Sequence, residues 1–202
     1  GKPTLVEIPI AMNLSDSEQV VRCAKLSGVT LGVVHPMRVR PEMIELRQRL
    51  LNGDENVRHI QGRFFIHRLE NVGSTGYRRS WTDNLLWHHT THLLDLGMWL
   101  LNEPVLQIQS FMPLPDTNTG IPMEVFLGTD TNKGQSLVCT GSYYSRESII
   151  EEFIVTDCGS YRMNVTRNTL TTGEGSYLIA SETDNCGIVT RDFVDAIKEG
   201  RQ

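Results

Sequence analysis

Residues 123–144 read MEVFLGTDTNKGQSLVCTGSYY, and this stretch decides the fold. Its two halves, Met123–Thr129 and Ser136–Tyr144, alternate between apolar and other residues with a period of two, which is typical of half-buried β-strands. Between them, Asn132-Lys133-Gly134 is a typical turn sequence. The stretch therefore predicts two antiparallel strands joined by a short turn.

The same pattern continues on both sides of this pair. Further candidate strands are Val57–Ile66, Val105–Met112, Ile149–Thr156, Tyr161–Thr166 and Tyr177–Ser181. Consecutive strands with short connections form an antiparallel sheet, and helices must cover one face of it. Two segments are expected to do so: a helix over Leu85–Leu101, which Pro104 ends, and a last amphipathic segment that ends at Gly200. Residues 37–202 are therefore predicted to form an α+β domain with a predominantly antiparallel sheet.

The first 36 residues follow a different plan. Thr4–Ile10 and Val29–Val34 are short, mostly apolar runs that predict strands, and Ser15 and Glu18 between them have the spacing of a helix-capping box. Gly28 stands where that helix should end. A strand–helix–strand unit of this size normally belongs to a parallel sheet, and two strands are too few for a stable one. Residues 1–36 are therefore expected to be the end of a larger domain whose earlier strands are missing.

Composition limits the function classes. A net charge of -5 without a long Lys/Arg run argues against nucleic acid as the main partner. No run approaches the ~18 apolar residues of a membrane span, and no secretion signal is recognised at the start. The four cysteines are scattered without C-x-x-C spacing, so reduced thiols in a cytoplasmic protein are expected; they are Cys23, Cys139, Cys158 and Cys186.

The chemistry is expected at the start of the Leu85–Leu101 helix, where three of the six histidines lie. His88 and His92 are four residues apart and Asp95 follows three later, so they share one face of an α-helix, whereas His89 points elsewhere. In one interpretation His92 is a general acid/base, Asp95 orients it and His88 binds the substrate. In the other they are metal ligands with a spacing similar to that of zinc hydrolases. Since His89 replaces the glutamate that activates water there, no metal site is predicted.

Residues before this helix and after the second strand are candidates for binding the substrate. A guanidinium group binds a carboxylate through two parallel hydrogen bonds. Arg79, directly before the histidine helix, and Arg38, close after His35, are therefore predicted to hold substrate carboxylates, and Trp81 is a candidate platform for the substrate. The sequence contains neither a phosphate-cradling glycine loop nor a Ser or Cys nucleophile signature.

In these motifs and in their order, the chain resembles the glucose–fructose oxidoreductase / inositol dehydrogenase (Gfo/Idh/MocA) family of nicotinamide-dependent dehydrogenases. The family's Glu-Lys-Pro motif is matched by Glu7-Ile8-Pro9, its following strand and turn by residues 32–38, its Asp-x-x-x-His-x-x-Asp helix by residues 88–95, and its late helix by residues 191–200.

The resemblance implies that residues 1–36 are the remnant of a Rossmann dinucleotide-binding domain. It also implies that residues 37–202 are a substrate-binding and oligomerisation domain like the C-terminal domain of dihydrodipicolinate reductase. The cofactor is then NADP or NAD, bound mainly by the missing N-terminal part, with Glu7, Ile8 and Pro9 near the nicotinamide.

Two departures from the family pattern point to one branch of it. The family's lysine is Ile8 here and its first helix carboxylate is His88, so His92 must carry more of the acid/base work. With residues 80–89, SWTDNLLWHH, they resemble dehydrogenases that use NADP to oxidise the cyclic hemiacetal of an aromatic ring-cleavage product to a pyrone dicarboxylate. The resemblance therefore implies a cytoplasmic enzyme of aromatic catabolism that acts on a small carboxylated substrate. It also implies a homodimer or homotetramer assembled through the antiparallel sheet.

Two other functions stay open from the sequence. The chain is either a non-catalytic binding or oligomerisation module, in which apolar side chains would fill the histidine face, or a metal-dependent hydrolase with an ion near His88 and His92. Because the phosphate-binding turn of a Rossmann fold is missing, the chain is expected to be inactive by itself.

Overall fold

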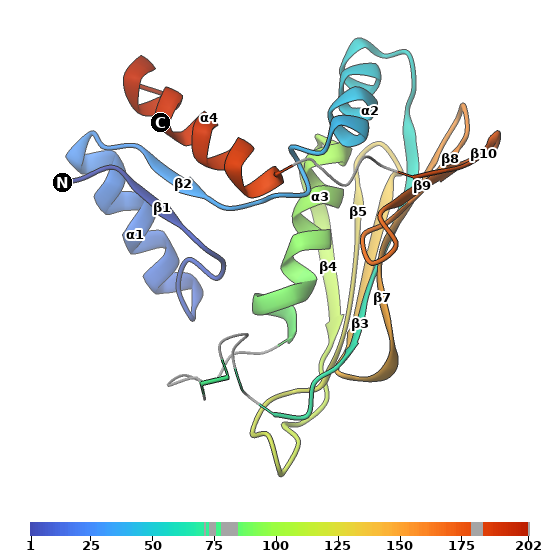
Figure 1. The fold of residues 1–202 in the computed structure, drawn as a ribbon, viewed down its shortest axis with the longest axis horizontal. Coiled ribbons are helices and arrows are strands. Elements are labelled where there is room, and N and C mark those ends of the chain that lie inside the picture. The colour runs from blue at the N-terminus through green and yellow to red at the C-terminus, as the bar shows by residue number, and fades with distance from the viewer. Residues whose placement is uncertain (71, 73–75, 78–84, 179–183, 202) are drawn as a thin grey trace. The chain divides into compact units, whose positions relative to one another are not determined.

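The structure is a computed structural model that describes residues 1–70, 72, 76–77, 85–178 and 184–201. The chain divides into two compact units (Figure 1): unit 1 comprises Gly1–Met43 and Glu182–Gln202, and unit 2 comprises Ile44–Ser181. The fold class is α+β, as the sequence predicts. The division of function between residues 1–36 and residues 37–202 stays a prediction.

Unit 1 contains a parallel strand pair with helices. Its elements are β1 (Thr4–Val6), α1 (Leu14–Ser27), β2 (Leu31–Val33) and α4 (Asn185–Glu199). Strands β1 and β2 pair in parallel, with Val6 opposite Val33, so the predicted strand–helix–strand unit is confirmed. Helix α4, which the sequence assigned to the cover of the antiparallel sheet, packs on this pair. A Cβ at Gly32 would lie only 2.8 Å from the ring of Phe193.

The first helix is capped two residues earlier than predicted. Its N-cap is Asn13, whose side-chain oxygen accepts a hydrogen bond from the backbone N–H of Asp16 at 2.9 Å. Ser15 therefore lies inside α1, and the capping-box prediction was wrong. Asparagine caps as well as serine does, and the earlier start adds the helical hydrogen bond from Ser17 N–H to the Asn13 carbonyl. Gly28 ends the helix in the left-handed conformation, at φ 60°, as predicted.

Unit 2 is built on a mixed sheet that has eight strands in the described part of the chain. In chain order they are β3 (Val57–His67), β4 (Val105–Phe111), β5 (Glu124–Thr131), β6 (Ser136–Ser142), β7 (Tyr144–Thr156), β8 (Ser160–Asn164), β9 (Thr169–Thr172) and β10 (Gly175–Leu178). Their spatial order is β10-β9-β8-β7-β3-β6-β5-β4. All neighbours are antiparallel except β3 and β6, which are parallel. The first strand of the unit thus lies in its centre.

Helix α3 (Thr91–Leu101) covers the inner face of this sheet (Figure 1). Its side chains Leu93, Leu96 and Leu100 are buried, and burying a leucine contributes about 2–3 kcal/mol each. The helix approaches closely because of Gly97, where a Cβ would lie 2.6 Å from Leu137 of β6. Helix α2 (Pro41–Asn52) adjoins the end of α3, since Arg47 donates to the Asn102 side chain at 2.5 Å.

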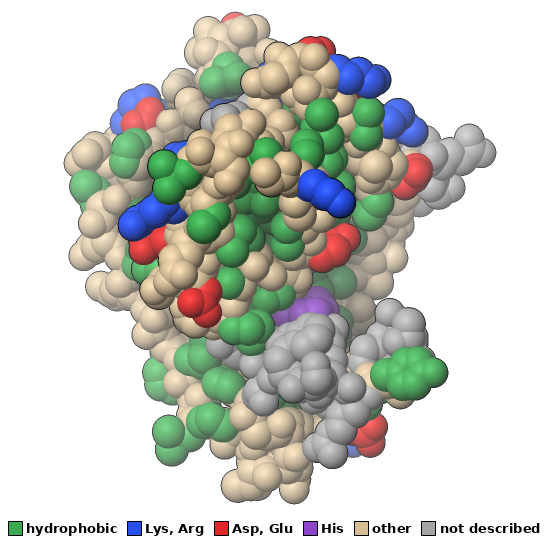
Figure 2. Space-filling view, turned by 90° about the vertical axis from the view of Figure 1, so that its left-hand side faces the viewer, with side chains coloured by type: hydrophobic (Ala, Val, Ile, Leu, Met, Phe, Trp, Pro, Cys, Tyr) green, Lys and Arg blue, Asp and Glu red, His purple; other side chains and the backbone are tan. Residues whose placement is uncertain are grey.

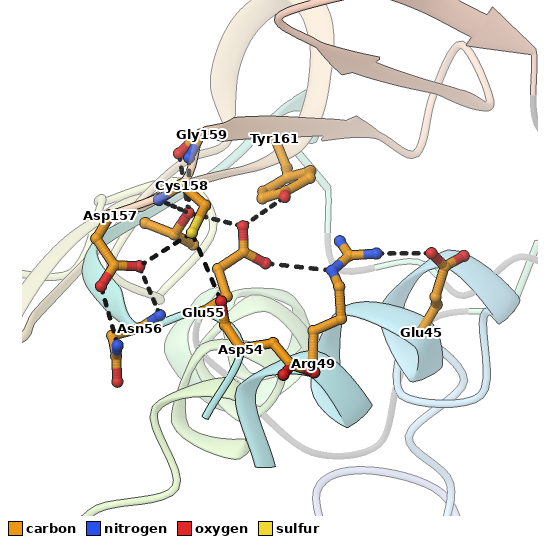
Figure 3. Close-up of polar contacts among 10 residues, drawn as sticks. Glu45, Arg49, Asp54, Glu55, Asn56, Asp157, Cys158, Gly159 and Tyr161 are labelled. Carbon is orange, nitrogen blue, oxygen red and sulfur yellow. Dashed lines mark hydrogen bonds and ion pairs between the residues drawn. The ribbon is translucent and has the colours of Figure 1, made fainter. Parts of the chain in front are cut away.

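One buried carboxyl group ties α2, the start of β3 and the β7–β8 turn together (Figure 3). Glu55, whose surface is 3% exposed, accepts hydrogen bonds from Tyr161 at 2.5 Å, Thr156 at 2.9 Å and Arg49 at 3.3 Å. The guanidinium group of Arg49 also donates to Glu45 at 2.6 Å. Burial, followed by the hydrogen bond to Glu55, raises the pKa of Tyr161.

A second buried carboxyl group has different surroundings. Glu152 of β7 is completely buried, and neither of its oxygens has a hydrogen-bond partner among the described residues. Positions 62 and 97 hold glycines, and a Cβ there would lie 2.9 Å and 3.1 Å from its two oxygens. Burial raises the pKa of Glu152 well above its ordinary value. Burial, with the Glu152 carboxyl next, also raises the pKa of the Cys139 thiol.

On the face shown in Figure 2, Lys and Arg side chains are scattered among acidic and hydrophobic ones and form no continuous basic patch. Within the described ranges, no helix is both long enough and apolar enough to cross a membrane.

Candidate active site

The three histidines stand where the helical segment begins, and this part is not an α-helix. Residues Leu86–Thr90 form a π-helical turn, η1, and α3 starts at Thr91. The backbone N–H of Thr91 donates to the Leu86 carbonyl five residues back, and its hydroxyl donates to the same oxygen at 2.5 Å. The prediction of a continuous α-helix from Leu85 was wrong here. The i, i+4 rule therefore does not govern His88 and His92, and π-turns of this kind are frequent at functional sites.

Packing against β6 accounts for the wider, π-helical turn at this place. A Cβ at Gly141 would lie 2.6 Å from the Thr90 hydroxyl and 2.7 Å from Leu85 Cδ2, so the turn rests on the strand backbone. Leu85 is fully buried in a cluster that also contains Met123 and Tyr143. The histidine turn is therefore fixed to the sheet from both of its ends.

Within this turn, His89 points to the sheet. Its ring stacks on Phe64 of β3, with centroids 4.7 Å apart and planes at 29°. Its Nδ1 lies 2.7 Å from the hydroxyl of Tyr143, directly after β6. The ring of His88 lies edge-on against it, with centroids 4.0 Å apart. Neighbouring imidazoles therefore contact each other, and both are only partly buried.

The other predicted residues of unit 2 are distributed as follows. His92 and Asp95 lie in the first turns of α3, and both are partly buried. Arg79 and Trp81, the predicted carboxylate clamp and substrate platform, lie outside the described residues. The roles of these four residues stay predictions.

The predicted cofactor residues belong to unit 1. Glu7, Ile8 and Pro9 follow β1, with a cis peptide bond between Ile8 and Pro9, while His35 and Arg38 follow β2. Because the two strands are parallel and adjacent, both turns lie at the same, carboxyl edge of the pair. Dinucleotides bind at the carboxyl edge of parallel sheets in doubly wound folds. Glu7, Ile8 and Pro9 therefore lie at the edge where such a cofactor would be expected, and their role, like the substrate-binding role of His35 and Arg38, stays a prediction.

Sequence reasoning missed two residues of the site. Tyr143 is fully buried and contacts His89, and Arg68, which follows β3, donates to the Tyr143 hydroxyl at 3.0 Å. The alternation of β6 places Tyr143 on the same face as Cys139 and Gly141, which was the available signal.

A metal centre finds no support in the described ranges. No three His, Cys, Asp or Glu side chains of the described residues gather closely enough to hold an ion. Among these residues, the four cysteines are all free thiols.

Comparison with known protein families shows which family this fold belongs to. Residues 41–184 match the family model of bacterial oxidoreductases, C-terminal. The chain belongs to this family. The predicted resemblance to Gfo/Idh/MocA dehydrogenases is thereby confirmed, and the match to the bacterial oxidoreductase C-terminal family spans the whole of unit 2.

Similar proteins support the same conclusion for this bacterial oxidoreductase. The chain is 26% identical over 207 residues to a 4-carboxy-2-hydroxymuconate-6-semialdehyde dehydrogenase from Sphingobium sp. (strain NBRC 103272 / SYK-6). The match covers 100% of this chain and 65% of that protein, so the chain spans less than two thirds of its relative.

Two solved structures share the fold. A UDP-N-acetylglucosamine 3-dehydrogenase from Acidithiobacillus ferrooxidans matches with a TM-score of 0.78 at 18% identity, over 98% of this chain and 62% of that one. Levoglucosan dehydrogenase in complex with NADH and L-sorbose matches with a TM-score of 0.80 at 16% identity, over 100% and 65%. At these identities the likeness establishes the fold.

Proposed function

We propose that the full-length protein is an NAD(P)-dependent dehydrogenase and that this chain forms its substrate-binding part. The substrate is a small carboxylated compound that is oxidised at a hydroxyl-bearing or cyclic-hemiacetal carbon. That carbon gives a hydride to the nicotinamide and its hydroxyl gives up a proton, which leaves a carbonyl or, from a hemiacetal, a lactone.

The proposal assigns the proton to His92. A neutral imidazole takes a proton at neutral pH because its ordinary pKa is about 6.5. His88 and Asp95 position the substrate and the base. Arg38 and Arg79 hold carboxylates of the substrate.

His35 and Trp81 complete the assigned substrate contacts. They complement the two arginines, since His35 precedes Arg38 by three residues and Trp81 follows Arg79 by two. A small substrate with carboxylate groups needs both charged clamps and a flat surface, and these residue types supply them.

One observation carries the proposal. The turn η1 of a bacterial oxidoreductase C-terminal domain rests on the sheet at Gly141, and its two imidazoles, like that of His92 at the start of α3, are partly exposed. A general base acts well only when its supporting element is rigid, and α3, which carries His92 and directly follows this turn, packs closely on the sheet at Gly97. Partly exposed imidazoles favour ligand binding over a helix face filled by apolar side chains. The similar Sphingobium protein is named for a carboxylated semialdehyde, which supports the substrate class.

The cofactor is assigned to NADP or NAD. Glu7, Ile8 and Pro9 are proposed to lie under its nicotinamide half, and their place at the carboxyl edge of β1–β2 supports this. When bound, the cofactor supplies the hydride acceptor. The similar levoglucosan dehydrogenase was solved with NADH, which supports a nicotinamide cofactor.

Association through the outer sheet face is part of the proposal. By strand alternation, Phe126 points away from α3, and Phe111 lies opposite it in the neighbouring strand. Their exposures of 42% and 66% are large for aromatic side chains. Such an apolar pair favours burial against a second copy, as a homodimer or homotetramer.

The deciding experiment is steady-state oxidation by the full-length protein. The probe is the cyclic hemiacetal of 4-carboxy-2-hydroxymuconate-6-semialdehyde, with NADP and NAD tested separately. His92→Ala should reduce kcat by about 10²–10⁴-fold, which is the contribution of a positioned base. A reduction below threefold would remove His92 from the mechanism.

His59→Gln is the matched control. His59 lies on the opposite face of β3, where its Nδ1 is hydrogen-bonded to Ser136 at 2.8 Å, so it is an imidazole with a similar contact outside the proposed site. Its kcat should stay within twofold of the unmodified protein. An equal loss in both variants would show a general effect on the fold.

A further inference from the structure

The outer face of the sheet in unit 2, which is the face away from α3, carries a row of polar side chains. Because Glu152 points to the helix side, its neighbour Glu151 points outward. The register places Arg63 of β3 on one side of Glu151 and Asn164 of β8 on the other, with Thr169 of β9 beside Asn164. Residues from four strands thus form one polar surface.

This surface encloses a cavity of about 550 Å³. Sites for small molecules have volumes of about 300–1,000 Å³, so a metabolite-sized ligand fits. The charged side chains that line the cavity are three arginines and two glutamates: Arg63, Arg162, Arg167, Glu147 and Glu151. The lining therefore carries an excess of positive charge, although the whole chain has a net charge of -5.

Two of these charged groups neutralise each other. The guanidinium group of Arg63 donates from Nε to Glu151 at 2.9 Å, and its Nη2 contacts the same oxygen. The Glu151 side chain is only 8% exposed, so little water competes for this pair. Arg63 and Glu151 therefore form a fixed, neutral edge of the cavity, and the other three charged groups decide which ligand it binds.

The positive charges of Arg162 and Arg167 have no anionic partner within the described part of the chain. Arg162 Cζ lies 5.4 Å from the ring centroid of Phe153, which orients the guanidinium group without neutralising it. Arg167 belongs to the β8–β9 turn, where its backbone N–H donates to the Asn164 side chain at 2.8 Å. Glu147 lines the same cavity but forms no ion pair with these described arginines.

We propose that this cavity binds a small oxyanion with two negative charges, a phosphate group or a dicarboxylate, between the guanidinium groups of Arg162 and Arg167. Guanidinium groups bind both kinds of oxyanion through paired hydrogen bonds. The Asn164 amide, whose oxygen accepts from Arg167, offers its N–H donors, and the Thr169 hydroxyl offers another. A ligand with two charges compensates both arginines, which a single carboxylate does not.

The first test measures anion binding by titration calorimetry of the full-length protein at pH 8. The probes are phosphate, succinate and, as the singly charged comparison, acetate. Phosphate or succinate should bind at least about tenfold more tightly than acetate, and the tighter of the two identifies the source of the charge. Arg162→Gln and Arg167→Gln should each weaken its binding about tenfold, because each removes a charged hydrogen-bond donor.

The matched control is Arg58→Gln. Arg58 also lies on β3, but it is outside the cavity, and its 63% exposed side chain pairs with Asp157 at 3.7 Å. Its loss should change the affinity for the dianion less than twofold. Phosphate bound elsewhere in the protein is insensitive to the cavity variants. Unchanged affinity in both Arg162→Gln and Arg167→Gln, or an equal loss in Arg58→Gln, overturns the proposal.

A variant with the opposite expected sign sharpens the test. Glu147→Gln removes a negative charge from the cavity lining, so it should tighten dianion binding about threefold. Weaker binding in this variant would contradict a site that selects negative charge. Loss of subunit assembly in Arg162→Gln, measured by sedimentation velocity, without a change in dianion affinity would make this face a contact between subunits and overturn the proposal.

The proposed anion site does not depend on the dehydrogenase. It lies on the face of the sheet away from α3, which carries His92. His92→Ala should therefore leave dianion affinity within twofold, whatever it does to NAD(P)-dependent turnover. Dianion binding that Arg162→Gln weakens, in a protein without turnover, keeps the anion site and removes the dehydrogenase. A loss of dianion affinity in His92→Ala equal to that in Arg162→Gln would place the anion at the candidate active site and overturn the inference.

Discussion

Glu55 and Glu152 are both buried in unit 2, yet the protein treats their carboxyl groups in opposite ways. Glu55 is surrounded by donors from α2, β7 and β8, namely Arg49, Thr156 and Tyr161 (Figure 3). Glu152 faces two glycines and the side chain of Leu93, and no described residue donates to it. The two carboxyl groups are buried to a similar extent, so the difference lies in their hydrogen-bond partners.

The comparison teaches that hydrogen-bond donors, more than burial, decide what a buried carboxyl group does. Donors replace the lost water around Glu55, so the group links three elements. Around Glu152, the two glycines let the helix and strand backbones approach the carboxyl group, and no described residue donates to it. That carboxyl group keeps its proton instead, which is why its pKa is raised.

Of the changes predicted here, the loss of the Glu55 carboxyl group should have the largest effect on the free energy of unfolding. Glu55→Ala removes the acceptor that Arg49, Thr156 and Tyr161 share, so the free energy of unfolding should fall by about 3–5 kcal/mol. Urea unfolding of the full-length protein measures this. The control is Glu45→Ala, which removes the exposed partner of the same Arg49 and should cost about 0.3–0.5 kcal/mol. Similar losses in the two variants would mean that the donors around Glu55 contribute little.

Neutralising Glu152 should have the opposite sign. The unfolded chain loses this proton near its ordinary pKa of about 4.3 and the folded chain keeps it, so the contribution of Glu152 is complete below that pH and is lost as pH rises towards the folded pKa. Glu152→Gln should therefore raise the free energy of unfolding at pH 7, by a gain that grows with pH above the ordinary pKa, and should change it by almost nothing at pH 4.

Urea unfolding at several pH values tests how the stability gain of Glu152→Gln changes with pH. The control is Glu151→Gln, because Glu151 is the neighbouring carboxyl group, points to the other face and pairs with Arg63. It should show no gain that grows with pH. A Glu152→Gln gain that is the same at pH 4 and pH 7 would contradict the raised pKa.

The smallest predicted effect comes from removing a single hydrogen-bond donor of Glu55. Tyr161→Phe removes one of the three hydrogen bonds to Glu55 and keeps the ring, so it should cost about 1 kcal/mol in the free energy of unfolding. Tyr144→Phe, which removes an exposed hydroxyl that donates to Asp116 at 3.2 Å, is the control and should cost less. A larger loss for Tyr144→Phe would indicate that the donors at Glu55 are interchangeable with water.

The sequence predicted the elements better than their arrangement. The parallel β1–β2 pair and most strands of unit 2 follow from apolar spacing, because local pattern reports which face is buried. The place of β3 between β6 and β7 does not, since strand order depends on contacts between distant segments. Strand β9 is short and mostly polar, so Thr169–Thr172 carries no strand pattern.

At the candidate site, residue types were more predictable than geometry. A cluster of histidines marks chemistry because few folds need it, and this did not require coordinates. The π-turn was not predictable, because it arises where Leu85 and Thr90 meet the strand backbone, and a helical spacing rule assumes that no such contact intervenes. The partnership of His89 with Tyr143 depends on that same turn.

Position 141 therefore acts as a spacer for the reaction although its residue carries no functional group. A single added methyl would collide with the turn above it and displace the imidazoles by tenths of an ångström. Rates of positioned reactions respond steeply to shifts of that size. A substitution at Gly141 would thus shift the proposed active-site histidines without replacing any of them.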